Sequence, residues 1–532
     1  MELLLNYRLV LFLRRFFTLN GIILAIFFPM KKTREKYIIG IDIGTGSTKA
    51  VAMVGEGTII ANSQIYYSTE ERLPGYSEQD CETIWKAFVN CIKKIISEVK
   101  YPPVSICLSS AMHGLLLIDK NNKPISPLIT WADTRSGKIA EEIRNLPEAE
   151  SLYKLTGTPI HSMTPLCKII WLKENEPALF KAAFKFISIK EFIWFRLFNV
   201  YETDHSIASA TELFNIETFQ WNDFSLKLCD ITSNQLPQLV ATDFIRKDLN
   251  PEIANSLNIP ATTMFCIGAS DGCLANIGSY AIKKGTAALT IGTSGAVRIA
   301  NKKPIFNFRE MTFNYVLDKQ TFICGGPVNN GGNIMDWLFE TFLKNIDPKG
   351  EDFETFFKIV NTIPAGSKGL LFLPYLYGER APVWDERSSG VFFGIKPFHT
   401  NPSFLKAALE GICYSMNEVL EVVESSAEKI VQLNVGGGFI QSETWMQILA
   451  DITGKKLCVI ETEDSSAVGA AILNMKALKM IEDYDSLQPK NNILIEPDLN
   501  NQLLYKKYYL VFKNLYCSLK ESMHEVYEIN NS

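Results

Sequence analysis

Apolar runs that end in glycine- and threonine-rich turns occur at two places about half a chain apart. The run 37–41 leads into the turn 42–48, and the run 287–289 leads into the turn 290–295. A short apolar run followed by glycine is typical of a buried strand that ends in a tight turn. Each pattern therefore predicts a strand, a turn and a second strand.

Helical and strand patterns alternate between these hairpins and after them. Residues 80–99 carry apolar side chains at helical spacing, and Asp80 can cap the N-terminus of that helix. Residues 442–453 predict another helix, which Gly454 ends. A β-rich opening followed by helices occurs twice, which predicts an α/β protein with two related lobes and a cleft between them. We place an N-terminal extension at 1–36, the first lobe at 37–284 and the second at 285–532.

Composition narrows the class of protein. The 532 residues are too many for one hydrophobic core, and a net charge of −5 argues against a nucleic-acid partner. The eleven cysteines contain no C-x-x-C pair, which predicts reduced, mostly buried thiols rather than disulfides or a zinc site. We therefore expect a cytoplasmic protein.

The first thirty residues do not fit this picture. Three arginines precede the apolar run 21–28, as in a signal peptide, but no small-residue cleavage site follows it. The run is also shorter than the ~20 residues that span a bilayer. We expect that translation starts at Met30 and that the protein does not associate with a membrane.

The chemistry of the two hairpins indicates a nucleotide site. Glycine allows backbone amides to approach an anion closely, and the hydroxyls of Thr45, Ser47 and Thr293 add donors. Two such hairpins facing one another would hold a polyphosphate from both sides, although each alone could be an ordinary turn. Neither contains a P-loop or a G-x-G-x-x-G fingerprint. Asp42 is suited to hold Mg²⁺ through water; the alternative is that it only caps its hairpin.

Two further segments suit phosphoryl transfer. Asp271 lies between two glycines after an apolar strand, where its carboxylate could take the proton from an attacking alcohol. The alternative is ordinary turn chemistry. The triple glycine at 436–438 removes side chains where a flat ring could lie, so we assign this turn to adenosine.

Two polar clusters could hold a polyhydroxy substrate. The first is Met112 and His113, and the second contains Trp131, Asp133 and Arg135. Aspartate and arginine suit hydroxyls and carboxylates, and a tryptophan face suits the C–H surface of a sugar. A single histidine could equally be a core residue with its hydrogen bonds satisfied.

Together with the segment 372–382, these motifs resemble the FGGY carbohydrate kinases, from about Tyr37 to Lys479. The resemblance implies a two-lobed ribonuclease H-like fold, as in hexokinase and actin, with ATP and sugar in the cleft between the lobes. It implies that Asp271 is the catalytic base. It also implies contacts to the phosphates from Thr45, Gly46, Gly292 and Thr293, to the nucleotide from Gly332, Asp336, Gly437 and Gln441, and to the sugar from Met112 and His113.

Within the family, the segments 110–113, 129–135 and 325–332 resemble members that act on gluconate. Xylulokinases typically have glutamine where this chain has Ala111, and asparagine where it has Ala132. We therefore expect ATP- and Mg²⁺-dependent phosphorylation of the terminal hydroxyl of D-gluconate, with xylulokinase or another pentulose kinase as the alternative. Gly46 replaces a second threonine of many members. Many relatives are dimers, so a homodimer is compatible with the resemblance.

Two other classes of protein fit the sequence less well. A nucleotide-driven binding protein of the actin or chaperone type would not need Asp271 or the 131–135 cluster. A sugar-sensing transcription regulator would need a helix-turn-helix, which the residues before Tyr37 do not provide.

Overall fold

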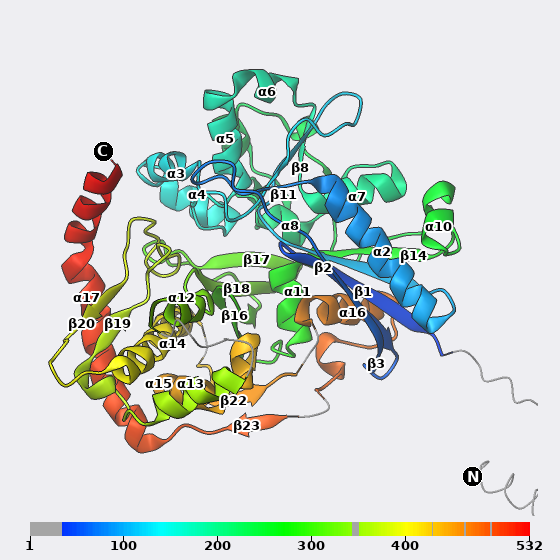
Figure 1. The fold of residues 1–532 in the computed structure, drawn as a ribbon. Coiled ribbons are helices and arrows are strands. Elements are labelled where there is room, and N and C mark those ends of the chain that lie inside the picture. Colours follow the sequence, from blue (N-terminus) through cyan, green and yellow to red (C-terminus); the bar gives the residue numbers. More distant parts are fainter. Residues whose placement is uncertain (1–34, 343–350, 428, 462–463, 490–491, 532) are drawn as a thin grey trace, which may run out of the picture. The chain divides into compact units, whose positions relative to one another are not determined.

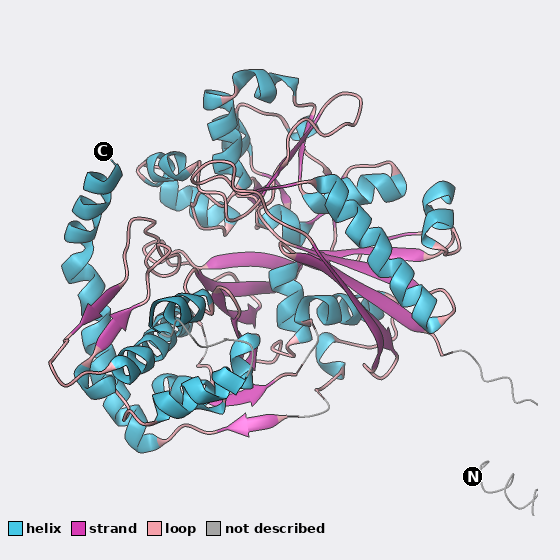
Figure 2. Ribbon diagram, in the orientation of Figure 1, coloured by secondary structure: helices cyan, strands magenta, loops and turns pink. Residues whose placement is uncertain are grey.

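The computed structural model describes residues 35–342, 351–427, 429–461, 464–489 and 492–531. The expected translation start at Met30 lies outside these residues. Figures 1 and 2 show helices packed around two larger β-sheets, one formed by the first half of the chain and one by the second. Among the described residues, no helix is long and apolar enough to cross a membrane.

The first larger sheet has the strand order β13-β14-β5-β1-β2-β3. The predicted hairpin forms its antiparallel part, and β5 and β14 extend it in parallel with β1. The bounds are β1 Tyr37–Ile43, β2 Ser47–Val54, β3 Ile59–Tyr66, β5 Ser105–Ser110, β13 Ile245–Arg246 and β14 Met264–Ser270.

The second larger sheet, in the order β17-β18-β16-β15-β21-β22-β23, repeats this plan. The second hairpin pairs β15 with β16, and β21 and β22 continue the sheet in parallel with β15. The bounds are β15 Thr286–Ile291, β16 Gly295–Asn301, β17 Phe313–Asp318, β18 Thr321–Val328, β21 Gln432–Gly436, β22 Lys456–Val459 and β23 Ile493–Ile495. The two-lobed α/β fold is confirmed.

Helices cover both faces of the first sheet. Because strand side chains alternate between faces, Ile39 and Ile41 pack with α2 (Cys81–Val99), whereas Ile38 packs with α16 (Ser465–Ala477). Gly40 allows α16 to approach closely, because a Cβ there would lie 1.9 Å from the carbonyl oxygen of Ala467. A helix from late in the chain thus completes the core of the first sheet.

The same helix packs against α11 (Asp271–Gly278), beside it in Figure 1. A Cβ at Gly278 would lie 1.9 Å from the carbonyl oxygen of Ser465, and one at Gly469 would lie 1.9 Å from that of Leu274. The two helices are therefore in backbone contact, which side chains at these glycines would prevent.

The two helices whose ends the sequence predicts are confirmed. The side chain of Asp80 accepts hydrogen bonds from the backbone amides of Glu82 and Thr83 at the start of α2. Ser442 caps α15 (Glu443–Thr453) in the same way, and Gly454 ends it with φ +64°. All eleven cysteines are free thiols, ten of them buried.

The remaining elements surround the two sheets. The other helices are α3 Gly137–Arg144, α4 Ala149–Thr156, α5 Pro165–Asn175, α6 Pro177–Ala182, α7 Ile189–Phe198, α8 His205–Ser209, α9 Asp223–Cys229, α10 Pro251–Leu257, α12 Asn333–Phe342, α13 Glu351–Asn361, α14 Asn401–Ser426 and α17 Leu499–Asn531. The short strands are β4 Glu78–Gln79, β6 Leu116–Ile118, β7 Leu128–Ile129, β8 Lys185–Ile187, β9 Glu202–Asp204, β10 Phe214–Asn215, β11 Gln220–Trp221, β12 Gln238–Val240, β19 Leu371–Leu373 and β20 Val391–Phe393. The 3₁₀ turns are η1 Ser233–Gln235, η2 Ser367–Gly369, η3 Gly438–Gln441 and η4 Tyr484–Ser486.

Candidate active site

A cavity of about 260 Å³ lies where segments of the two halves of the chain meet. Five of the residues that the sequence singles out line it: Thr45, Met112, His113, Trp131 and Asp271. The other lining residues are Met163, Thr290, Ser294, Gly295, Ala296, Arg298, Phe313, Tyr315, Pro327 and Arg380. Its few convergent polar groups are typical of a small-molecule site.

Asp271 enters the cavity at the junction of β14 and α11. Ser270 caps α11 by accepting a hydrogen bond from the amide of Cys273, and the amide of Gly272 donates to Asp271 Oδ1 at 2.7 Å. Burial raises the pKa of Asp271 to about 6, although the nearby Arg298 guanidinium favours the charged form. A carboxylate with this pKa is ionised at neutral pH and still basic enough to accept a proton, as a general base must be.

Two arginines in the cavity were missed by sequence reasoning. Arg298 on β16 donates to Thr290 Oγ1 at 3.1 Å, and burial lowers its pKa. Arg380 donates from one terminal nitrogen to the carbonyl oxygen of Val328, whereas its Nε has no hydrogen-bond partner among the described residues. The quoted segment 372–382 contains Arg380, but no spacing signal marked either arginine as part of a site.

His113 lines the cavity as a neutral group. Its Nδ1 donates to the carbonyl oxygen of Ala210 at 2.6 Å, so Nε2 is the nitrogen that accepts from the Tyr315 hydroxyl at 3.0 Å. Burial lowers the pKa of His113 to about 3, which keeps the ring uncharged at neutral pH. The hydrogen bonds of the ring are satisfied by protein partners, as in the core alternative, and the ring also borders the cavity; its contact with a sugar stays a prediction.

The structure places Asp133 and Arg135 outside the lining of this cavity. Arg135 forms ion pairs with Asp133 at 2.7 Å and Glu78 at 2.6 Å, and its guanidinium lies 3.5 Å from the ring centre of Tyr76. Its side chain is only 5% exposed. The pair therefore stabilises the loop that carries Trp131.

Trp131 connects this loop to the first hairpin. Its indole nitrogen donates to Thr45 Oγ1 at 2.9 Å, and the guanidinium of Arg380 lies 4.9 Å from the ring. Unlike Thr45, the next two residues do not line the cavity. Gly46 is exposed, whereas Ser47 is buried and its hydroxyl accepts a hydrogen bond from Gln64 Nε2 at 3.0 Å.

Three predicted nucleotide segments meet at the end of β15. The amide of Gly332 donates to the carbonyl oxygen of Gly292 at 2.6 Å, and the amide of Asn333 donates to that of Thr293 at 3.2 Å. Gly437 has φ +103°, and a Cβ there would lie 2.3 Å from the carbonyl oxygen of Ile291. These glycines are thus required by close backbone approach.

Two further predicted nucleotide contacts lie beside these segments. Asp336 is exposed in the first turn of α12, and Gln441 is exposed at the end of η3. Ser294 and Gly295, the last two residues of the turn 290–295, line the cavity. The predicted nucleotide segments therefore adjoin the cavity that contains Asp271.

Asp42 is buried at the end of β1, where Ser109 Oγ donates to its Oδ1 at 2.6 Å. Burial and the charges of Asp464 and Asp271 raise its pKa well above the ordinary value. Within the described ranges, no group of three or more histidine, cysteine or acidic side chains is placed to hold a metal ion. A cation here would need water and phosphate oxygens as additional ligands.

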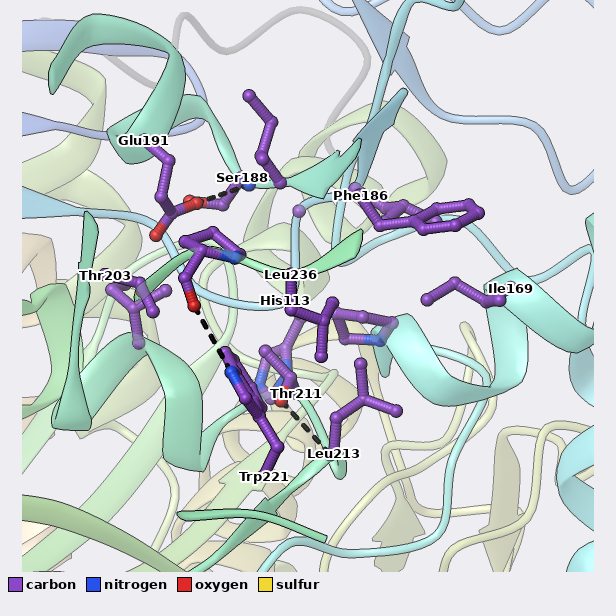
Figure 3. A pocket seen from close by; sticks show the side chains of 16 residues that line it. His113, Ile169, Phe186, Ser188, Glu191, Thr203, Thr211, Leu213, Trp221 and Leu236 are labelled. Carbon is purple, nitrogen blue, oxygen red and sulfur yellow. Dashed lines mark hydrogen bonds between the residues drawn. The ribbon is translucent and has the colours of Figure 1, made fainter. Parts of the chain in front are cut away.

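A second cavity, of about 30 Å³, borders His113 (Figure 3). Ile169 and Phe186 lie on one side of it, and Thr203 and Glu191 on the other. This volume is too small for a sugar. Of these two cavities, the one that contains Asp271 is therefore the candidate substrate site.

Comparison with protein families covers most of the chain. Residues 37–278 match the N-terminal domain of the FGGY family of carbohydrate kinases, and residues 287–478 match its C-terminal domain.

Named relatives agree with this match. The gluconokinase of Bacillus subtilis (strain 168) is 40% identical over 85% of this chain and 89% of its own length. The xylulose kinase of Staphylococcus xylosus is 29% identical over 90% of this chain and 99% of its own.

Solved structures share the fold. A gluconate kinase from Lactobacillus acidophilus superposes with a TM-score of 0.87 at 32% identity, over 92% of this chain and all of that one. A ligand-bound xylulose kinase from the same organism gives a TM-score of 0.88 at 32% identity, with the same coverage. The chain therefore belongs to the FGGY family of carbohydrate kinases.

Proposed function

We propose that this kinase phosphorylates the terminal hydroxyl of D-gluconate with ATP, giving 6-phospho-D-gluconate and ADP. The observation that carries the proposal is Asp271, poised as a base in a cavity next to a phosphate hairpin. The choice of gluconate is supported by relatives named gluconokinase at 40% and 39% identity, against 29% for a named xylulose kinase. Xylulose is the second candidate, because a named xylulose kinase structure is equally similar.

Asp271 acts on the acceptor. Its carboxylate takes the proton from the terminal hydroxyl as that oxygen attacks the γ-phosphorus in line. The bond from the γ-phosphorus to the bridging oxygen breaks, and ADP leaves. Arg298 and Arg380 supply buried positive charge for the transferring phosphoryl group and the substrate carboxylate.

The hairpins hold the nucleotide. Thr45, Gly46 and Ser47 contact its phosphates from one side, and Gly292 and Thr293 from the other. The remaining contacts, to the nucleoside, come from Gly332, Asp336, Gly437 and Gln441. The backbone contacts of Gly332 and Gly437 with the second hairpin, at Gly292 and Ile291, support this assignment.

Asp42 fits a role in holding Mg²⁺ through water. Burial and the nearby carboxylates of Asp464 and Asp271 raise its pKa, so a positive charge beside it would be favourable. Bound Mg²⁺ would neutralise phosphate charge during transfer.

The carbohydrate contacts come from Met112, His113 and Trp131, which line the cavity. We assign Asp133 and Arg135 a supporting role, because they satisfy one another and Glu78 instead of lining the cavity. They maintain the position of Trp131.

We also propose a cellular location, a lobe boundary and an oligomeric state. Use of ATP and eleven free thiols support a cytoplasmic location. A lobe boundary at 284/285 is supported by the start of β15 at Thr286. Exposed leucines on α17 support a homodimer, which sedimentation equilibrium would test.

A substrate panel tests the function directly. ADP formation would be measured with Mg²⁺ and D-gluconate, D-xylulose, L-ribulose or glycerol. We expect kcat/KM for gluconate to exceed the others. Preferred turnover of a ketose would discard gluconate and retain Asp271 as base, whereas no turnover of any sugar would reject the kinase assignment.

A further inference from the structure

Lys168 on α5 is a buried lysine whose ammonium group is hydrogen-bonded to three backbone carbonyl oxygens. Its side chain is fully buried, and Nζ donates to the carbonyl oxygens of His113 at 2.7 Å, Thr130 at 2.7 Å and Met163 at 2.8 Å. A lysine ammonium has three donors, and all three are used here on main-chain oxygens.

These three carbonyls belong to segments that form walls of the large cavity. His113 and Met163 line it, and Thr130 directly precedes the lining residue Trp131. The segments come from separate parts of the fold: the loop between β5 and β6, the loop after β7, and the loop before α5. One ammonium group is therefore hydrogen-bonded to three separate segments that border the cavity.

The cost of burying this charge indicates that the contact is specific. Burial lowers the pKa of Lys168 to about 7, while the charge of Asp133 favours the protonated form. An apolar side chain would avoid that cost but would leave three buried carbonyls with one fewer donor each.

We propose that Lys168 is a positioning residue for the carbohydrate: it sets the places of Met112, His113, Trp131 and Met163 through their backbone. The proposal rests on the proposed function, in which this cavity binds the acceptor sugar. Its bonds do not reach the nucleotide segments 292–293, 332–336 or 437–441. Loss of the ammonium therefore affects carbohydrate binding and leaves ATP binding unchanged.

The first test compares Lys168→Met with Lys173→Met. Lys173 is on the same helix but 39% exposed, and it pairs with Asp230 at 3.2 Å. We expect the gluconate KM of Lys168→Met to rise ~10-fold or more, with the ATP KM within about twofold. Lys173→Met should match wild type in both constants. Equal rises in both KM values, or no rise for gluconate, would overturn the proposal.

A second variant, Met112→Ala, tests whether the cavity binds the sugar at all, independently of the role of Lys168. Met112 lines the cavity directly, so this variant must raise the gluconate KM if the cavity binds the sugar. A change in Met112→Ala without one in Lys168→Met rejects the role of Lys168 alone. No change in either variant rejects the cavity as the sugar site.

If Lys168→Met does not fold, the same two KM values would be measured for Lys168→Gln, which keeps a neutral donor. They would also be measured for the wild-type protein at several pH values. Raising the pH through about 7 deprotonates Lys168 and removes one donor. The ionisable groups that face it are His113, His161, Cys167, Asp133 and Arg135.

Burial lowers the pKa of both histidines and raises that of Cys167, so these three groups stay neutral over the tested range. We expect the wild-type gluconate KM to rise between pH 6 and 8.5, and the ATP KM not to follow. A constant ratio of the two KM values across this range would contradict the proposal.

Discussion

Asp271 owes its proposed role to its surroundings at the level of single atoms. Burial raises its pKa to about 6, and only the deprotonated form can accept the proton of the acceptor hydroxyl. We expect kcat, measured at saturating gluconate, to fall as the pH drops below about 6 and to level off above it. A pH–rate profile measures this; an acid limb near pH 4 would contradict the assignment.

Replacement of the same residue gives a second prediction. Asp271→Asn keeps the shape of the side chain but cannot accept a proton, so turnover should fall by about 10²–10⁴ or more. ATP binding, measured by calorimetry, should be retained. A variant with near wild-type kcat would exclude Asp271 as the base.

Arg135 shows where reading of residue types is insufficient. The sequence predicts that the polar loop 130–135 contacts the substrate, but the pattern does not reveal which of its side chains line the cavity. Trp131 does, whereas Asp133 and Arg135 are bound to each other. Arg298 and Arg380 were missed because an arginine that lines a site has the same local pattern as one on a surface.

The Arg135 ion pairs therefore predict a loss of stability. Arg135→Met leaves the buried carboxylate of Asp133 without its ion-pair partner and leaves Glu78 only the exposed Arg72 at 3.2 Å, a loss that typically costs about 3–5 kcal/mol. Urea denaturation should show this loss. A large, selective rise in the gluconate KM with unchanged stability would restore Arg135 as a direct substrate contact.

At the scale of elements, the contact of α11 with α16 links stability to catalysis. A Cβ at Gly469 would lie 1.9 Å from the carbonyl oxygen of Leu274, so Gly469→Ala must separate the two helices. Because Asp271 begins α11, we expect both the melting temperature and kcat to fall. Gly55→Ala is the control, since no atom lies within 4 Å of its Cβ. Equal behaviour of the two variants would refute the argument.

Local elements were the part of the fold most accessible from sequence. The hairpins and the ends of α2 and α15 depend on nearby glycines and caps, which periodicity and turn chemistry reveal. The return of α16 onto the first sheet depends on Gly40 meeting Ala467, and no local pattern encodes such a distant contact.

At the scale of the whole molecule, α17 reaches the segment that carries Arg380. Asp385 accepts hydrogen bonds from the Tyr516 hydroxyl at 2.7 Å and from His524 Nε2 at 2.5 Å. The backbones of Asp385 and Glu379 are also paired. Although burial alone would raise it, the pKa of Asp385 is lowered by the bonds from His524 and Tyr516.

We expect Asp385→Asn to lower the melting temperature, because Tyr516 and His524 on α17 both favour a carboxylate at this position. We also expect it to reduce kcat/KM, because Asp385 belongs to the segment that carries Arg380. Thermal unfolding and steady-state kinetics would be measured on the same preparation. A lower melting temperature with unchanged kcat/KM would limit α17 to a structural role.

The packing of α16 on the first sheet also has a consequence for synthesis on the ribosome. Ile38, Val51 and Met53 lack their covering helix until residues 465–477 have left the exit tunnel. The nascent first half therefore exposes an apolar sheet face during most of translation, a state that favours aggregation and chaperone capture. The order of the chain thus makes the first lobe dependent on nearly the last part to be translated.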